Sequence, residues 1–590
     1  MQGSITPDKT EKRFQGVPIA PGIAHAEGLV HWLEDEEIPY RKVAEAEIPK
    51  EVARFEAALI STRGELLEIQ ERIASSIGAK DASIFDAHLL VVEDRTLIDE
   101  VLKSLEREQC NIEYIFHKVA EKYIRTLSAI DDPYLRERVV DIEDVARRVI
   151  RHLMGKDPRL VSAHDRPHII VAHTLTPSDT AMMNRSLVLG FATEAGSKTS
   201  HTAIMARSLD IPAIAGLHNI CEEIDSGDDL LIDGYTGVLI LNPSPETLEQ
   251  YGRIELQKEA VAEKLELIRD TISTTPDGKH IILSANIELP EEMEDVIDNG
   301  AEGVGLYRTE FLYLNRSKPP DEEEQYATYR RVAERCAPHG VIIRTLDIGG
   351  DKSAESLDLP EEQNPFLGCR AIRFCLDNPK IFKTQLRAIL RASAHGNVRL
   401  MYPMVSGEAE LQRANALLEE AKAELRQENQ SFREDLEVGA MIEVPSAALA
   451  ADTLAAHVKF FSIGTNDLIQ YAIAVDRVNE RIAHLYDPTH PAIVRLIQMI
   501  VKAAHDHGIW VGVCGEMAGD IQLTPLLIGL EVDELSTGAA LVPRVKKAVQ
   551  SLDFQACREL AQHALTCGSS KLILERCTEI ASRHYPELLN

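Results

Sequence analysis

The stretch VGAMIEVPSAALAADTLAAHVKFFSIGTNDLIQY, residues 438–471, holds the pattern on which the fold prediction depends. It begins with the apolar run 438–443 and reaches a second apolar run at 460–465, and each run has the length of a buried β-strand. Parallel neighbouring strands need a crossover connection, which is usually a helix. A strand, a helix-length segment and a second strand therefore predict one repeat of a parallel α/β fold.

The same strand-then-helix rhythm continues through the C-terminal half of the chain. Eight such units in about 315 residues predict a (β/α)8 barrel, which we assign to residues 274–590. The six further strands are expected at 281–287, 303–308, 341–347, 398–404, 510–515 and 532–537.

The N-terminal part alternates between two residue patterns, one typical of strands and one typical of helices. Short apolar runs with Gly and Pro at 16–32 and 167–243 predict the strands of one α/β domain. Residues 38–155 instead show helical periodicity, so this block is interpreted as an insertion into that domain. Its helices are expected at 51–73, 83–106 and 142–154, and the charged run 245–272 is expected to form a linker helix.

The predicted fold class is therefore a multidomain α/β protein. Its parts are an N-terminal extension (1–14), an α/β domain (15–36 plus 156–243), a helical subdomain (37–155), a linker helix (244–273) and the barrel (274–590).

Composition excludes several classes of protein. The 590 residues include 63 Lys and Arg against 95 Asp and Glu, a net charge of −32, which excludes a nucleic-acid binder with a basic surface. No run of about 18 apolar residues is present and residues 1–14 are polar, so neither membrane insertion nor a secretory signal is expected. Nine cysteines without a CxxC pair argue against a disulfide framework. We expect a cytoplasmic protein.

In a (β/α)8 barrel, chemistry occurs at the C-terminal ends of the strands. Polar residues gather there in this sequence, although any single one is also what the end of a strand ordinarily contains. Arginine binds phosphate and carboxylate oxygens bidentately, so three arginines predict a small polyanion that carries both groups. The residues concerned are Arg308, Arg344, Glu443, Asn466, Asp467, Arg477 and Cys514.

Two further roles follow from residue type at this mouth. Glu443 and Asp467 are hard oxygen ligands at the ends of adjacent strands, which is the pattern favoured by Mg²⁺. Cys514, with an ordinary thiol pKa, is mainly protonated at neutral pH and could deliver a proton. The alternative for Cys514 is that of a small buried apolar residue.

The segment AGSKTSHTAIMAR, residues 195–207, places a histidine at a predicted helix start. Thr199 and Ser200 are favourable N-cap residues, and the free N–H groups of a helix N-terminus would stabilise a phosphate on His201. Neutral imidazole is a competent nucleophile near physiological pH. The alternative is a solvated or capping histidine.

These segments together resemble a known family. The histidine segment is similar to the phosphohistidine signature of enzymes that take phosphate from phosphoenolpyruvate. With the domain order, the match is to the enzyme I family of the phosphoenolpyruvate-dependent sugar phosphotransferase system, over nearly the whole chain after residue 14. The barrel motifs that carry the resemblance are GLYRTEFL (305–312), RTLDIGGDK (344–352), NPFLGCRAIR (364–373), IEVPSA (442–447), FFSIGTNDLIQY (460–471) and GVCGEMAGD (512–520).

The resemblance implies a reaction and its partners. Phosphate would pass from phosphoenolpyruvate to His201, giving pyruvate, and then to a histidine of the carrier protein HPr, which would dock on the helical subdomain. The α/β domain would swivel between these two partners, and the enzyme would form a homodimer through the barrel. Cys514 would protonate the enolate carbon. The substrate would be bound by Arg308, Arg344, Asn466, Asp467 and Arg477, and Mg²⁺ would be held by Glu443 and Asp467.

Three departures from the family pattern concern loop geometry: Ser197 in place of a glycine, Lys198 in place of arginine, and Val478 in place of a small residue. Three other interpretations were weighed. Pyruvate phosphate dikinase or phosphoenolpyruvate synthase would need a nucleotide-grasp domain, which the N-terminal texture does not indicate. A non-catalytic regulator would not need the reactive groups retained here. A nitrogen-regulatory paralogue would carry an N-terminal sensor domain.

Overall fold

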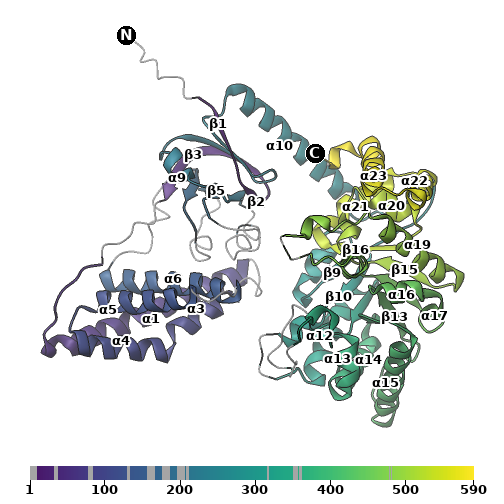
Figure 1. The fold of residues 1–590 in the computed structure, drawn as a ribbon, viewed down its shortest axis with the longest axis horizontal. Helices are drawn as coiled ribbons and strands as arrows, with labels where there is room; N and C mark the ends of the chain where they lie inside the picture. Colours follow the sequence, from purple (N-terminus) through teal and green to yellow (C-terminus); the bar gives the residue numbers. More distant parts are fainter. Residues whose placement is uncertain are drawn as a thin grey trace. The chain divides into compact units, whose positions relative to one another are not determined.

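The computed structural model of the chain divides into two compact units, Met1–Leu256 and Gln257–Asn590, each described here by itself (Figure 1). His201, Ser197, Lys198 and Val478 lie outside the residues that the structure describes. The described residues are 10–31, 38–76, 84–128, 133–155, 166–175, 187–195, 206, 211–314, 316, 318–349, 357, 362–477, 479 and 481–589.

The C-terminal unit contains a closed barrel of eight parallel strands in chain order, with the last strand paired to the first. The predicted barrel and all eight of its strands are confirmed. Several strands end earlier than expected, so that Asp347, Glu443 and Cys514 lie just beyond strands instead of within them. The strands are β9 (Ile282–Ile287), β10 (Gly303–Tyr307), β11 (Gly340–Arg344), β12 (Asn397–Tyr402), β13 (Glu437–Ile442), β14 (Phe460–Ile463), β15 (Trp510–Val513) and β16 (Glu534–Gly538).

The strands are apolar throughout because both of their faces are buried. Inside the barrel, Leu306, Ile342, Met401, Met441 and Phe460 form one packed cluster. Residues on the outer face join a larger cluster with the surrounding helices. These helices are α11 (Met293–Asp298), α12 (Glu322–Cys336), α13 (Ile372–Asp377), α14 (Pro379–Ala392), α15 (Glu408–Gln427), α16 (Pro445–Leu449), α17 (Ala451–Ala455), α18 (Thr465–Ile473), α19 (Pro491–Asp506), α20 (Thr524–Gly529), α21 (Val542–Ser551), α22 (Phe554–Thr566) and α23 (Ser570–His584).

The N-terminal unit contains an eight-stranded mixed sheet with the order β1-β8-β7-β3-β4-β5-β6-β2. Alternate residues of β4 enter different apolar clusters, with Ile169 and Val171 on one face and Ile170 and Ala172 on the other. The sheet is therefore buried on both faces, as its apolar runs predict. Its strands are β1 (Lys12–Gln15), β2 (Val17–Ala20), β3 (Ile23–His31), β4 (His168–Ala172), β5 (Val188–Thr193), β6 (Ala213–Ala215), β7 (Asp229–Asp233) and β8 (Val238–Leu241).

The N-terminal extension is shorter than predicted. Residues 12–14, which the prediction left outside any domain, form β1 together with Gln15 and pair antiparallel with β8. The first residue with described structure is Thr10, so residues 1–9 of the predicted extension lie outside the described residues. The strand was missed because Phe14 is the single apolar residue of Lys12–Gln15, so the segment carries no apolar alternation.

A block of helices with its own apolar core lies between β3 and β4 in the chain. The prediction of one helix over 83–106 is wrong, because Asp94 caps a new helix there by accepting hydrogen bonds from the N–H groups of Thr96 (2.7 Å) and Leu97 (3.4 Å). Among the described helices, none combines the length and apolar character that crossing a membrane requires. The block comprises α1 (Ile48–Ser76), α3 (Ile84–Val92), α4 (Arg95–Glu108), α5 (Ile112–Ser128) and α6 (Pro133–Met154).

The predicted linker helix is present as α10 (Pro245–Ile268) and ends four residues earlier than expected. Its first half packs on the sheet of the N-terminal unit through Tyr251, which contacts Leu231 and Ile240. Its second half packs on the barrel core through Val261 and Leu265. Each half thus belongs to the unit on which it is buried.

Close packing of α20 on α22 makes the barrel sensitive at Gly529. A Cβ atom at this position would lie 1.9 Å from the carbonyl oxygen of Cys557, which is backbone and cannot move aside. Gly529→Ala is expected to lower the free energy of unfolding of the barrel by about 1–3 kcal/mol. Thermal unfolding measures this, with Gly568→Ala as the matched control because nothing lies within 4 Å of its Cβ position. Equal melting temperatures for the two variants would contradict the packing argument.

Candidate functional site

A cavity of about 160 Å³ opens at the C-terminal ends of the barrel strands. Residues that follow parallel strands meet at this rim because all the strands point the same way. All seven residues that the sequence predicts for the barrel mouth line this cavity, namely Arg308, Arg344, Glu443, Asn466, Asp467, Arg477 and Cys514. The cavity is also lined by Glu288, Asp347, Phe366 and Arg370.

Two of the four arginines are buried and share one carboxylate. Asp347 Oδ2 lies 3.1 Å from Arg344 Nη1, and Asp347 Oδ1 lies 3.0 Å from Arg370 Nη2. Arg344 also donates to Glu310 Oε1 at 2.7 Å. Burial alone would lower the pKa of Arg344, but the carboxylates of Glu310 and Asp347 hold its pKa above the ordinary value. Both guanidinium groups therefore stay charged inside the protein.

The other two arginines stand at the rim. The side chain of Arg308 is 36% exposed and donates to Glu288 Oε1 at 2.8 Å. The side chain of Arg477 is 37% exposed, with Nη1 3.5 Å from Glu516 Oε1. Asn466 is connected to Glu516 too, because its amide donates to Glu516 Oε1 (3.0 Å) and its oxygen accepts from the Glu516 N–H (2.9 Å). The rim arginines can change partners at low cost because water reaches them.

Glu443 is a deeply buried carboxylate at the site, and its pKa is raised. It is 1% exposed, and its Oε1 accepts a hydrogen bond of 2.7 Å from the N–H of Met404. Burial, together with the carboxylates of Asp467 and Asp347, raises the pKa of Glu443 well above its usual range. A bound cation would stabilise the charged form of Glu443 and so oppose that shift. Glycine at 464 leaves room beside the carboxylate, since a Cβ atom there would lie 2.6 Å from Glu443 Oε2.

These observations fit a magnesium site. Within the described residues, no cluster of three or more His, Cys, Asp or Glu side chains could hold a metal ion by itself. Two carboxylates, Glu443 and Asp467, with the remaining positions left to substrate oxygens and water, is the arrangement that Mg²⁺ accepts and that a closed structural zinc site does not.

The thiol of Cys514 faces the same cavity from the residue after β15. It is 3% exposed, and its Sγ lies 3.7 Å from the carbonyl oxygen of Ile463. Burial raises the pKa of Cys514 to about 11. The thiol is thus protonated at neutral pH, which suits a proton donor and not a nucleophile.

The sequence reasoning missed Arg370 as a site residue. It lies in the quoted motif NPFLGCRAIR, but in a loop after β11 and not at the end of a strand. Its guanidinium reaches the cavity with only 4% of the residue exposed. The signal that could have found it is the arginine within a Gly-containing motif, which strand-end reasoning does not consider.

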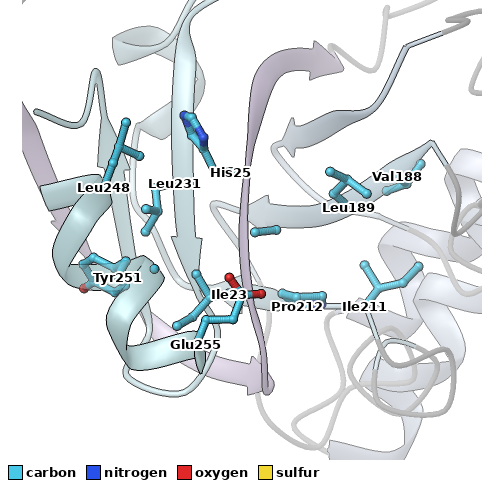
Figure 2. Close-up of a pocket in the computed structure, with 12 residues that line it drawn as sticks. Ile23, His25, Val188, Leu189, Ile211, Pro212, Leu231, Leu248, Tyr251 and Glu255 are labelled. Atoms are coloured by element: carbon cyan, nitrogen blue, oxygen red, sulfur yellow. The ribbon is translucent and has the colours of Figure 1, made fainter. Parts of the chain in front are cut away.

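A larger cavity of about 570 Å³ lies in the N-terminal unit, and Figure 2 shows the side chains around it. Its lining includes the apolar side chains of Ile23, Leu231, Leu248 and Pro212. Among its described lining residues there is no arginine or lysine, and the described histidine there is His25, which pairs with the carboxylate of Asp229 outside the lining. Size alone would favour this cavity, but its chemistry does not suit a small polyanion, so the barrel mouth is the candidate active site.

A closed parallel barrel with a cavity of clustered arginines and carboxylates at its C-terminal mouth defines a barrel enzyme for a small anion. Comparison with known proteins narrows this class. The family model for the PEP-binding domain of PEP-utilising enzymes matches residues 262–554, the N-terminal model matches 15–138 and the mobile-domain model matches 164–237.

Two relatives match 96% of the chain. The phosphoenolpyruvate-protein phosphotransferase of Staphylococcus carnosus (strain TM300) is 44% identical over 96% of this chain and 99% of that protein. The phosphoenolpyruvate-protein phosphotransferase of Priestia megaterium is 45% identical over 96% of this chain and 98% of that protein. A solved structure of an Enzyme I protein is 38% identical and covers 42% of this chain and 99% of that chain, with a TM-score of 0.36. The chain belongs to the phosphoenolpyruvate-protein phosphotransferase family of PEP-utilising enzymes, and it is a transferase.

The raised pKa of Cys514 makes a testable prediction. Below the pKa the thiolate fraction grows about tenfold per pH unit, so alkylation of Cys514 by iodoacetamide is expected to accelerate about 100-fold from pH 7 to pH 9 without levelling off. Peptide mass spectrometry measures the rate at this cysteine. Each sample is also scored at the partly exposed Cys369 as an internal reference. A plateau in the Cys514 rate below pH 9 would show that its thiol is not held protonated.

Proposed function

We propose that the chain transfers the phosphoryl group of phosphoenolpyruvate to its own His201, releasing pyruvate, and then to a histidine of the carrier protein HPr, as the first step of phosphotransferase-system sugar uptake. The observation that carries this proposal is the convergence of four arginines and two metal-type carboxylates on one small cavity. Phosphoenolpyruvate carries a phosphate and a carboxylate, and arginine matches both. Family membership supports the same reaction.

The proposed substrate contacts follow from the two pairs of arginines. The buried pair, Arg344 and Arg370, and the rim pair, Arg308 and Arg477, hold the phosphate and the carboxylate between them, with the amide of Asn466 as a further donor. Charge that develops on the transferring phosphoryl group is met by donors already in place, which is the main source of rate in such transfers. The volume of about 160 Å³ suits a small molecule of this kind.

Glu443 and Asp467 are proposed to hold Mg²⁺. When bound, this ion neutralises charge on the phosphate oxygens and helps to orient the substrate. The support within this chain is the crowding of the Glu443, Asp467 and Asp347 carboxylates, which raises the pKa of Glu443, and the space that glycine leaves at 464.

In the transfer step, a bond forms between a ring nitrogen of His201 and phosphorus, and the bond from phosphorus to the enol oxygen breaks. The electron pair leaves on the enolate of pyruvate. The protonated thiol of Cys514 then gives its proton to the enolate carbon that becomes the methyl group, and water reprotonates the thiolate. The high pKa of Cys514 keeps this proton in place until the enolate forms.

The proposed reaction requires two meetings of His201, one with the barrel mouth and one with HPr. We therefore propose that the α/β domain (15–36 plus 156–243) swivels, that the linker helix (244–273) contains the hinge, and that the helical subdomain (37–155) docks HPr. A homodimer joined through the barrel (274–590) completes the proposal.

All nine cysteines are free thiols, which suits the reducing cytoplasm where we place the enzyme.

Phosphorylation of His201 tests the function directly. The protein is incubated with labelled phosphoenolpyruvate and Mg²⁺, and acid-labile label is measured on His201→Ala and on His218→Ala, an exposed histidine of the same unit. Label is expected on the wild type and His218→Ala and absent from His201→Ala, and it should move to HPr when that protein is added. Equal label on the two variants would rule out the assignment.

The metal site is tested by Glu443→Gln, which keeps an acceptor for the N–H of Met404 but removes the charge. The Mg²⁺ concentration for half-maximal activity is expected to rise at least about tenfold. Glu420→Gln, an exposed carboxylate on α15, serves as the control. An unchanged Mg²⁺ requirement in Glu443→Gln would exclude Glu443 as a ligand.

A further inference from the structure

Residues 362–371, the described segment directly before α13, contain the short 3-10 turn Pro365–Leu367 and are called the Arg370 loop because they carry the buried Arg370. An arginine side chain needs partners when it leaves water, since a buried unpaired charge is costly. Two partners come from outside the loop. Asp347 Oδ1 lies 3.0 Å from Nη2, and the hydroxyl of Tyr471 lies 3.1 Å from Nη1.

The Tyr471 hydroxyl makes a second contact with the same loop. It donates a hydrogen bond of 2.6 Å to the carbonyl oxygen of Phe366 while it accepts from Arg370. The ring of Phe366 lies beside the guanidinium, with 5.9 Å from its centroid to Arg370 Cζ. Burial raises the pKa of Tyr471, so the hydroxyl retains the proton that it donates. One hydroxyl thus fastens the loop at two points.

Tyr471 also connects the loop to the helix that carries a proposed metal ligand. Asp467 and Tyr471 are four residues apart on α18 and therefore lie on one face of that helix. Asp467 Oδ2 stands 3.9 Å from Arg370 Nη2, which is longer than a hydrogen bond. The direct hydrogen bond from α18 to Arg370 is the one made by Tyr471.

The backbone around Arg370 is strained and needs such fastening. Ala371 has φ +53° and ψ −125°, a conformation that residues with a Cβ atom rarely adopt. Gly349, with φ +116°, passes so close that a Cβ atom there would lie 2.4 Å from the Cβ of Arg370. Strain of this kind persists only where surrounding contacts determine the conformation.

We infer that Tyr471 is a positioning residue that holds Arg370 in the orientation that binds the substrate anion. This inference rests on the proposed function, because it takes phosphoenolpyruvate as the anion. Without the hydroxyl, Arg370 Nη1 and the carbonyl oxygen of Phe366 both lose a partner, and the loop is free to turn the guanidinium away from the cavity.

The test is Tyr471→Phe in the full-length protein, with formation of phosphohistidine measured against phosphoenolpyruvate concentration. We expect KM for phosphoenolpyruvate to rise about tenfold and kcat to stay within about threefold, the signature of lost binding common to ground and transition states. KM does not depend on the fraction of folded enzyme, so a loss of stability alone cannot imitate this result. In an Arg370→Lys background, Tyr471→Phe should change KM by less than about twofold, because lysine lacks the planar guanidinium group that Tyr471 is proposed to position.

The matched control is Tyr402→Phe, on β12 of the same barrel. The Tyr402 hydroxyl is buried and has no hydrogen-bond partner within the described part of the chain, so its removal should leave KM unchanged. If wild type and Tyr402→Phe are active and Tyr471→Phe has the wild-type KM, or if its effect persists undiminished in Arg370→Lys, Tyr471 does not position Arg370. If wild type forms no phosphohistidine, the proposed function fails and this inference fails with it.

Discussion

The Asp347 carboxylate between Arg344 and Arg370 is the interaction on which the barrel mouth depends. Its two oxygens each face one buried guanidinium, at 3.1 and 3.0 Å, so like charges are held side by side in a place with little water. Without a shared carboxylate, two buried arginines would repel each other and pay a large desolvation cost. With it, they keep donors that remain available to an anion. Glu310 and Tyr471 supply the remaining support from opposite sides of the rim.

The balance of charge at the mouth favours binding of a cation. Four arginines face six carboxylates, which leaves an excess of negative charge, and burial together with neighbouring carboxylates raises the pKa of Glu443 within this group. The six carboxylates are those of Glu288, Glu310, Asp347, Glu443, Asp467 and Glu516. An anionic substrate alone would increase that excess, whereas a substrate that arrives with a divalent cation would increase it much less. The chain as a whole carries a net charge of −32, but the four arginines of the barrel mouth are collected at one cavity of this acidic molecule.

Much of the fold could be predicted because a strand buried on both faces must be apolar, and each barrel strand is a short apolar run. The errors have local causes. A single helix over 83–106 was expected because apolar periodicity continues across Asp94, whereas the side chain of Asp94 caps a new helix there. β1 was missed because an edge strand such as Lys12–Gln15 needs little apolar character. Arg370 was missed because a loop has no regular periodicity from which the direction of its side chains could be predicted.

The sequence by itself determined the repeat of eight strands, the residue types that follow them and, through its motifs, the family to which the chain belongs. These follow from period, length and residue chemistry, which are local properties of the chain. Only the tertiary structure decided which charges are buried and which stay at the rim, that Arg370 joins Arg344 across Asp347, and that Tyr471 connects the loop of Arg370 to α18. Those facts depend on closure of the barrel, which brings residues as far apart as 308 and 514 to one cavity and sets how much water each can reach.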